Sequence, residues 1–302
     1  MEKKKLVNYL KLLLKLAITV AALLFVFSKI DVREVLRLFK ESKLLLIFGA
    51  LLLFILSKIV SAYRLNRYFK TIGIHLSSLF YLKFYLLGMY YNLFLPGGIG
   101  GDGYKVYYLT KRYDVKTGKI FWAVMLDRVI GVLALFCLAV AFSWFVDLPE
   151  IYYRFSWALI PLALLISYLV FRYFFRDFVP VFVITNLQSF VVQLLQTFSA
   201  LLILWSLDVR VDIMPYLFVF LVSSIVAVLP VTVGGVGARE FTFILGAKWL
   251  GLDMNLSIAL SFIFYLITAF TSFWGIIYSL APKTMLSREK STDVAETEYL
   301  KE

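Results

Sequence analysis

Long apolar runs separated by short polar segments make up most of the chain. A helix that crosses a hydrocarbon core of about 30 Å needs roughly 17 to 25 apolar residues. Eight runs are near or above this length, and they cover residues 12–28, 44–61, 77–95, 120–146, 155–171, 178–206, 213–229 and 256–280. A shorter apolar run follows at 241–250. The pattern therefore predicts an all-α polytopic membrane protein.

Similar Pro/Gly sequences interrupt the pattern once in each half of the chain, at Leu95-Pro-Gly-Gly-Ile-Gly-Gly-Asp102 and Leu229-Pro-Val-Thr-Val-Gly-Gly235. Pro removes a helix hydrogen bond and Gly relaxes the backbone, so each helix should break there. Paired, broken apolar segments at corresponding positions point to the binding site of a secondary transporter. The candidate substrate-binding residues of the two motifs are Pro96, Gly97, Gly98, Gly100, Gly101, Pro230, Gly234, Gly235 and Gly237.

The charge of the chain fits a membrane environment. Hydrophobic residues make up 62% of the sequence, which excludes an ordinary soluble domain, and the formal net charge is +12. The basic residues flank the apolar runs, so topology and contact with anionic lipid explain them better than nucleic acid does. They cluster at residues 3–11, 64–70, 105–119, 172–176 and 283–290.

Placing these basic clusters in the cytoplasm has a consequence for the two interrupted runs. Run 77–95 then starts and ends on the cytoplasmic side, and segment 213–250 starts and ends outside. We therefore expect about six full spans and two re-entrant hairpins, one from each face, with the motifs at their tips in an inverted repeat. Eight simple spans, with each motif a loop, is the alternative.

The domain prediction follows from the same pattern. We expect one transmembrane domain at 1–285, with pseudo-repeat halves at about 44–146 and 178–280. Residues 286–302 are polar and acid-rich, and we expect a disordered cytoplasmic tail there. Both termini are predicted to be cytoplasmic, in a multi-pass protein of the cell membrane.

Charged residues follow each motif directly. An ionisable side chain inside a membrane costs from about 3 kcal/mol on insertion scales to about 10 kcal/mol in simulations, so each one is a functional hypothesis. Asp102 and Lys105 are spaced to pair on one helix face, and Arg239 and Glu240 follow the second motif in the same way. Each pair is a candidate contact for an anionic headgroup at a helix N-terminus, or an ordinary interfacial pair.

Further polar residues lie inside two apolar runs. Asp127 and Arg128 are adjacent and point in different directions on a helix, so we expect each to find a partner on another helix. A polar stripe along one face of the 178–206 helix is predicted either to hydrogen-bond to neighbouring helices or to line a groove. This stripe, with Asp127, forms the candidate cavity lining and consists of Asn186, Ser189, Gln193 and Gln196.

Several classes of site are excluded by residues that the sequence lacks. His75 is the only histidine, so a histidine-based metal site or a Ser-His catalytic site is not expected. The sequence has no G-x-x-x-x-G-K-[ST] motif, which argues against an ATP-driven pump. We expect no cofactor and no bound metal.

The motif that ends at Asp102 resembles one in the membrane region of lysylphosphatidylglycerol synthases, and residues 234–240 resemble the second motif of that family. Asp127-Arg128 also resembles a family position, and the resemblance extends over nearly all of residues 5–285. Lys105 is a departure, because the family usually has Arg there and Lys lacks the bidentate fork. The soluble aminoacyl-transfer domain of full-length synthases does not occur in the sequence.

The resemblance implies movement of a phospholipid or polyprenyl-linked lipid between leaflets. The leading hypothesis is a flippase or scramblase-type transporter rather than an enzyme. Lys105, Arg128 and Arg239 would contact the phosphate, and Asp102 and Glu240 would gate the cavity or couple an ion. Its partners would be anionic phospholipid or polyprenyl-phosphate lipid.

The alternative is an integral-membrane transferase or a partner subunit in lipid-linked glycan synthesis. Asp102, Asp127 and Glu240 would then act as general bases or as ligands of Mg²⁺. Relatives of this size also occur alongside membrane glycosyltransferases, so such an enzyme is a further candidate partner. Nucleic acid is not expected as a partner.

Overall fold

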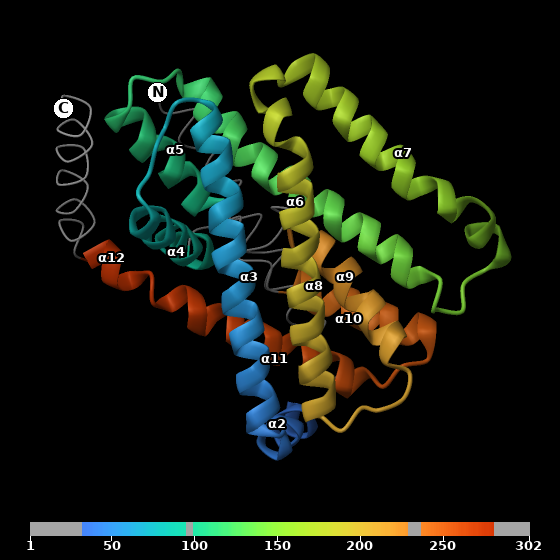
Figure 1. Cartoon of the computed structure of the whole chain (residues 1–302). Coiled ribbons are helices and arrows are strands. Elements are labelled where there is room, and N and C mark those ends of the chain that lie inside the picture. The colour runs from blue at the N-terminus through green and yellow to red at the C-terminus, as the bar shows by residue number, and fades with distance from the viewer. Residues whose placement is uncertain (1–31, 95–98, 229–236, 281–302) are drawn as a thin grey trace, which may run out of the picture.

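The computed structural model describes residues 32–94, 99–228 and 237–280, and this part of the chain is built from helices (Figure 1). They are α2 (Val32–Glu41), α3 (Leu44–Thr71), α4 (Ser78–Phe94), α5 (Gly100–Arg112), α6 (Thr117–Ser143), α7 (Glu150–Phe174), the short 3-10 helix η2 (Arg176–Val181), α8 (Phe182–Ser206), α9 (Ile213–Val228), α10 (Ala238–Leu250), α11 (Met254–Phe273) and α12 (Ile276–Leu280). The predicted all-α polytopic membrane fold is confirmed.

Five helical segments in the described part of the chain are long and apolar enough to cross a membrane. They are Leu44–Thr71, Thr117–Ser143, Tyr153–Phe174, Arg176–Ser206 and Met254–Leu280. These coincide with five of the six predicted full spans. The sixth predicted span, 12–28, and the predicted tail, 286–302, lie outside the described residues.

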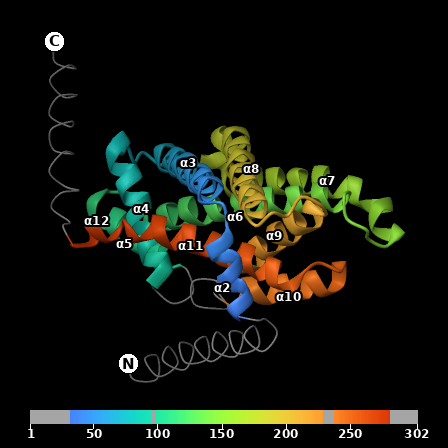
Figure 2. The same cartoon turned by 90° about the horizontal axis from the view of Figure 1, so that it is seen from below.

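The antiparallel pair α3 and α8 runs through the molecule from end to end (Figure 1). Ala50 and Ala200 are fully buried, and small residues of this kind let two membrane helices approach closely. Ser199 Oγ donates a hydrogen bond to Ala50 O at 2.9 Å, which ties the helices together in their apolar surroundings. Figure 2 shows α3 and α8 on one side of the molecule and α10 on the other, with α6 and α9 between them.

Helix α7 lies at the periphery. Its main neighbours are α6 and η2, and only 11% of its most apolar 18-residue stretch is buried. Most of its surface is therefore in position to face lipid.

The helices on either side of each motif are short and pack against each other. They have 17 residues in α4, 13 in α5, 16 in α9 and 13 in α10. At 1.5 Å per residue, each is about 20–25 Å long, which is less than a hydrocarbon core of about 30 Å. We call α4–α5 the first hairpin and α9–α10 the second hairpin.

The outer ends of the two hairpins, which are the ends away from the Pro/Gly motifs, lie at opposite ends of the molecule (Figure 1). The rings of Phe80 and Tyr108, 6.0 Å apart, join the outer ends of α4 and α5 where α3 ends. Asp253 N donates to Tyr216 Oη at 3.1 Å, which joins the outer ends of α9 and α10 where α11 begins. The choice between two re-entrant hairpins and eight simple spans stays a prediction. Residues 95–98 and 229–236 lie outside the described residues, so the depth of the tips stays a prediction.

Among the described residues, the predicted basic clusters 64–70, 105–119 and 172–176 lie toward the end of the molecule where α3, α5 and α7 end and α6 begins. Lys119 at the start of α6 pairs with Asp177 of η2 at 2.6 Å, near the ends of α3 and α5. The prediction for Arg64 was wrong, because this residue is inside the bundle and only 5% exposed. The reason is that α3 continues to Thr71 instead of ending near residue 61.

Candidate functional site

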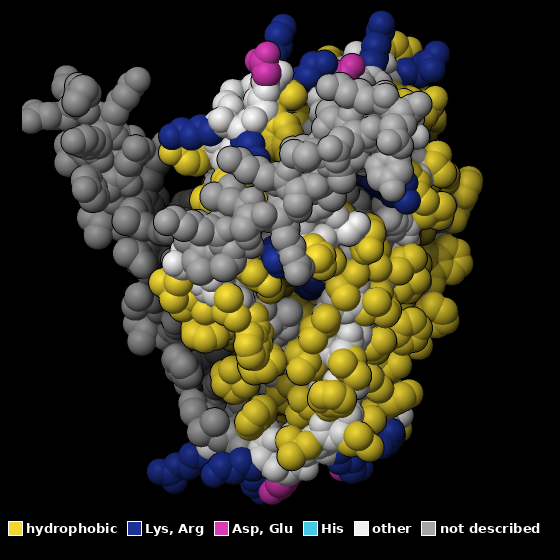
Figure 3. Space-filling view, turned by 60° about the vertical axis from the view of Figure 1, so that its left-hand side comes forward, with side chains coloured by type: hydrophobic (Ala, Val, Ile, Leu, Met, Phe, Trp, Pro, Cys, Tyr) yellow, Lys and Arg dark blue, Asp and Glu magenta, His cyan; other side chains and the backbone are white. Residues whose placement is uncertain are grey.

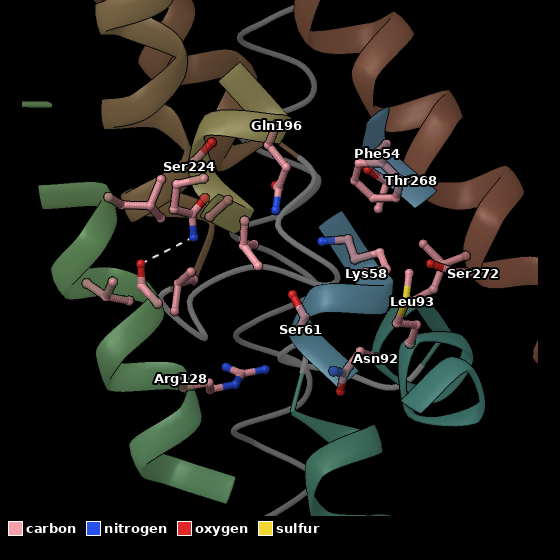
Figure 4. A pocket seen from close by; sticks show the side chains of 18 of the residues that line it. Phe54, Lys58, Ser61, Asn92, Leu93, Arg128, Gln196, Ser224, Thr268 and Ser272 are labelled. Carbon is pink, nitrogen blue, oxygen red and sulfur yellow. Dashed lines mark hydrogen bonds between the residues drawn. The ribbon is translucent and has the colours of Figure 1, made fainter. Parts of the chain in front are cut away.

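A cavity of about 360 Å³ lies where the inner ends of both hairpins meet the long helices. Figure 4 shows Lys58 of α3, Arg128 of α6 and Gln196 of α8 directed toward the same space. The hairpin residues in the lining are Tyr85, Met89, Asn92 and Leu93 of α4, Asp102 and Lys105 of α5, Ser224, Ala227 and Val228 of α9, and Arg239 and Glu240 of α10. Both interrupted segments therefore contribute to one site.

The described lining carries more positive than negative charge. It contains three acidic side chains, which are those of Asp102, Asp127 and Glu240. The five basic side chains of the lining are those of Lys58, Arg64, Lys105, Arg128 and Arg239. The cavity therefore has an excess of two positive charges and suits an anionic ligand.

Asp102 connects two cations at the start of α5. Its Oδ1 atom is 3.1 Å from Lys105 Nζ, and its Oδ2 atom accepts a hydrogen bond from Arg128 Nε at 2.7 Å. The predicted pairing of Asp102 with Lys105 on one helix face is confirmed. Because Asp102 and Lys105 are buried, the acid neutralises charge that would otherwise be costly in this position.

Two glycines explain how Lys105 reaches this acid. A Cβ atom on Gly101 would lie 1.9 Å from Gly88 O, so α4 and α5 can cross this closely only if residue 101 is glycine. A Cβ atom on Gly88 would lie 2.5 Å from Lys105 Cε, so the lysine chain crosses α4 above that glycine. Gly101 N also donates to Asn92 Oδ1 at 2.8 Å, which caps the start of α5.

Asp127 pairs with a residue that the sequence did not single out. Arg64 Nε donates to Asp127 Oδ1 at 2.7 Å, and Arg64 Nη1 donates to Ser189 Oγ at 2.7 Å. This contact joins α3, α6 and α8 inside the bundle. Since Arg128 contacts Asp102 of α5, the prediction that Asp127 and Arg128 find partners on other helices is confirmed.

Glu240 closes the start of α10. Its Oε2 atom accepts a hydrogen bond from Gly237 N at 2.7 Å, which satisfies one of the unpaired N–H groups at the helix start. Gly237 has a φ of 85°, a conformation that glycine adopts without strain. The Oε1 atom of Glu240 accepts from Ser261 Oγ at 3.0 Å, which links α10 to α11.

Arg239 lies on aromatic rings instead of beside a carboxylate. Its guanidinium carbon is 4.6 Å from the ring centroid of Phe264 and 5.0 Å from that of Phe220. Arg239 Nη2 donates to Ser224 Oγ at 2.7 Å. The side chain is thus held in place at the cavity by rings and a hydroxyl group.

Sequence reasoning missed Lys58 of α3, which lies over an aromatic ring as Arg239 does. Its Nζ atom is 4.5 Å from the ring centroid of Phe54, and the side chain lines the cavity. A lysine inside the apolar run 44–61 was the available signal.

The polar stripe of α8 serves both of the predicted purposes. Gln193 and Gln196 line the cavity, and Gln193 Nε2 also donates to Gly131 O of α6 at 3.3 Å. Ser189 accepts from Arg64, and Asn186 Nδ2 donates to Phe182 O of its own helix at 2.8 Å. Ser189 and Asn186 lie outside the described lining.

The motif residues are divided between described and undescribed parts of the chain. Gly100 and Gly101 form the start of α5, and Gly237 precedes α10. Outside the described residues lie Pro96, Gly97, Gly98, Pro230, Gly234 and Gly235.

The molecular surface shows basic groups between apolar regions. Figure 3 shows Lys and Arg side chains in a hollow about halfway along a largely hydrophobic face.

The contacts of the three acidic residues bear on whether the cavity could hold a metal ion. Among the described residues, no group of three or more His, Cys, Asp or Glu side chains is arranged to hold a metal ion. Asp102 and Asp127 contact basic groups, and Glu240 contacts a backbone N–H group and a hydroxyl group.

The sequence matches a known family over more than half of its length. Residues 12–188 match the family model of the lysylphosphatidylglycerol synthase TM region. The chain belongs to this family. The matched residues include α3, the first hairpin and α6, whereas the second hairpin follows the matched residues. A comparison with curated proteins found no match.

Proposed function

We propose that the protein is a lipid transporter of the flippase or scramblase type, which moves an anionic phospholipid or a polyprenyl-linked lipid between leaflets. One observation carries this proposal: a positively charged cavity lies within a bundle whose outward-facing side chains are largely apolar. A headgroup in the cavity would exchange water for polar side chains, while its hydrocarbon chains stayed in the bilayer. Membership of a lipid-related membrane family supports the same conclusion.

The two hairpins provide a basis for access from both leaflets. They open at opposite ends, and the starts of α5 and α10 both line the cavity. The positive end of a helix dipole lies at each start, which favours an anion. Movement of one hairpin relative to the other would expose the cavity to each leaflet in turn, as in other transporters with inverted repeats.

The setting of this activity is part of the proposal. The protein would lie in the cell membrane with both termini in the cytoplasm, and it could serve a membrane glycosyltransferase that consumes the transported lipid. Because the sequence has no ATP-binding motif, net movement would require a gradient or removal of the lipid on one side.

The contacts of the acidic residues favour transport over the transferase alternative. A general base or Mg²⁺ ligand needs carboxylate oxygens that are available to substrate or metal. Both oxygens of Asp102 contact cations, and both oxygens of Glu240 accept hydrogen bonds within the fold. These groups are therefore better suited to shaping the cavity than to catalysis.

Leaflet exchange in proteoliposomes tests the proposal. Fluorescent anionic, zwitterionic and polyprenyl-phosphate lipids are followed by quenching of the outer leaflet, with protein-free liposomes as the baseline. We expect exchange that depends on the headgroup and falls by about tenfold in Arg239→Gln, the loss of one charged hydrogen-bonding group. Lys248→Gln is the matched control, because Lys248 is exposed on the same helix. A folded protein that leaves every lipid at the baseline rate contradicts transport and favours the transferase.

A further inference from the structure

Two of the five cations in the cavity differ from the other three in their partners. Arg64 contacts Asp127, and both Lys105 and Arg128 contact Asp102. In the described part of the chain, no carboxylate lies within ion-pair distance of Lys58 or Arg239. The hairpin tips do not change this balance, because residues 95–98 and 229–236 contain no Asp or Glu.

Aromatic rings hold these two cations near each other. The rings of Phe54 and Phe264 meet edge to face with their centroids 5.5 Å apart. Lys58 lies over the first ring and Arg239 over the second. A ring face attracts a cation more weakly than a carboxylate does. Both side chains line the cavity, and neither forms an ion pair with a described carboxylate.

Both side chains keep hydrogen-bond donors for a ligand. A lysine ammonium has three N–H groups, and among the described residues none accepts a hydrogen bond from Lys58. Of the five guanidinium N–H groups of Arg239, one is directed at Ser224 Oγ at 2.7 Å and one at Ser223 Oγ at 3.4 Å. The remaining donors suit the several oxygens of a phosphate group, which an arginine can contact in a bidentate manner.

Uncharged polar groups surround the two cations. Gln196 of α8 and Thr268 of α11 line the same cavity, and Figure 4 shows Gln196 and Lys58 directed toward each other. Such groups can bind additional phosphate oxygens without changing the charge of the site.

We infer that Lys58 and Arg239 together bind a doubly charged phosphate group, so that the cavity prefers a lipid with a phosphomonoester or diphosphate headgroup to a phosphodiester lipid. The excess of two positive charges in the lining is neutralised by a dianion, whereas a phosphodiester leaves one charge uncompensated. This inference rests on the proposed function and narrows its substrate class. Lys105, Arg128 and Arg64 are assigned to the cavity wall, since each already contacts a carboxylate; Lys105 and Arg128 share Asp102, and Arg64 contacts Asp127.

Binding to the purified protein in detergent tests the inference independently of transport. The probes are short-chain phosphatidic acid, which carries a phosphomonoester, and short-chain phosphatidylglycerol, which carries a phosphodiester. Inorganic phosphate tests for a soluble ligand of the same chemistry. We expect phosphatidic acid to bind about tenfold more tightly than phosphatidylglycerol at about pH 7, the effect of one additional charged contact. If inorganic phosphate bound as tightly as phosphatidic acid, this would contradict the inference that the phosphate group belongs to a lipid.

Charge variants assign the preference to the two residues. Lys58→Gln and Arg239→Gln should each reduce the preference to about twofold or less, while Lys58→Arg and Arg239→Lys should retain most of it. The matched controls are Lys70→Gln on α3 and Lys248→Gln on α10, both at exposed positions. A preference that persists in both neutral variants contradicts the inference.

The pH dependence supplies a second readout that loss of folding would not imitate. The second pKa of a phosphomonoester is about 6, so at about pH 5.5 phosphatidic acid carries about one negative charge. The preference over phosphatidylglycerol should then shrink to about twofold or less. Equal binding of the two lipids at about pH 7 overturns the inference even if both are exchanged between leaflets. Absence of exchange for every lipid would instead overturn the proposed function.

Discussion

The two hairpins meet at one cavity but place their charges in different surroundings. At the start of α5, Asp102 is held between Lys105 and Arg128. At the start of α10, Glu240 accepts hydrogen bonds within the fold, and Arg239 rests on the rings of Phe220 and Phe264. The first hairpin therefore makes an ionic contact to α6, whereas the second presents to the cavity a cation that forms no ion pair with a described carboxylate.

The close contacts within the two hairpins differ as well. Gly101 meets the backbone of Gly88, which has no side chain that could move aside. A Cβ on Gly246 in α10 would meet the methyl groups of Val219 in α9, at 2.7 and 2.8 Å. We interpret the first hairpin as the more rigid part of the site and the second as the part that contacts the ligand.

The largest expected effect is the loss of the buried acid in the first hairpin. Asp102→Asn leaves Lys105 and Arg128 without their negative partner, and breaking a buried pair in this way costs about 3–5 kcal/mol. We expect a large fall in thermal stability in detergent. Asp114→Asn, at an exposed position just after α5, is the control. Normal stability combined with lost lipid exchange would show that Asp102 has a functional role instead.

A smaller effect is expected from the glycine contact. Gly101→Ala should destabilise the protein by about 1–3 kcal/mol, because the added methyl group meets the backbone of α4 and forces the helices apart. Gly246→Ala should cost less, since the Val219 side chain can adjust. Gly103→Ala is the control on α5, because nothing lies within 4 Å of its added Cβ. Thermal unfolding that ranks Gly246→Ala as the more damaging change would reverse the comparison.

The cap of the second hairpin should contribute about 1 kcal/mol. Glu240→Ala removes the acceptors for Gly237 N and Ser261 Oγ, and losses of helix caps fall in this range. Glu240→Gln keeps one carbonyl acceptor and should lose less stability. If Glu240→Ala lowered thermal stability as strongly as Asp102→Asn, the two acidic residues would contribute equally to the stability of the fold.

The smallest effect is expected at an exposed ion pair outside the two hairpins, between the start of α3 and the loop that follows α8. Lys43 donates a hydrogen bond to Asp208 there, and this contact lowers the pKa of the Asp208 carboxyl group. A lowered pKa stabilises the folded state above the ordinary Asp value of about 3.9, and the contribution disappears as the pH falls through the lowered pKa. The pair is exposed, so Asp208→Asn should change thermal stability at neutral pH by no more than the measurement error. A clear loss of thermal stability would show that this exposed ion pair stabilises the protein as the buried ion pairs do.

The arrangement of helices follows from the sequence because the bilayer imposes it. Apolar length predicted five spans that the structure contains, and Pro and Gly predicted where the helices on either side of each motif end. Local spacing predicted the contact between Asp102 and Lys105, since residues three apart share a helix face.

Partners on other helices were not predictable in the same way. The adjacency of Asp127 and Arg128 showed that each needed a separate partner, but it did not identify Arg64. The spacing of Ser57, Ser61 and Arg64 by four and three residues marks one polar face of α3 and was an available signal. Lys58 and Arg239 come together through the contact of Phe54 with Phe264, which depends on how α3 and α11 pack.

The peripheral position of α7 has a consequence for the response of the protein to its membrane. Because this helix is held mainly by α6 and η2 and is otherwise mostly unburied, its tilt should follow bilayer thickness. None of its residues lines the described cavity. Lipids of different chain length would therefore reorient α7 while leaving the ligand-contacting side chains in place, so adaptation to the membrane and selection of the headgroup belong to separate helices.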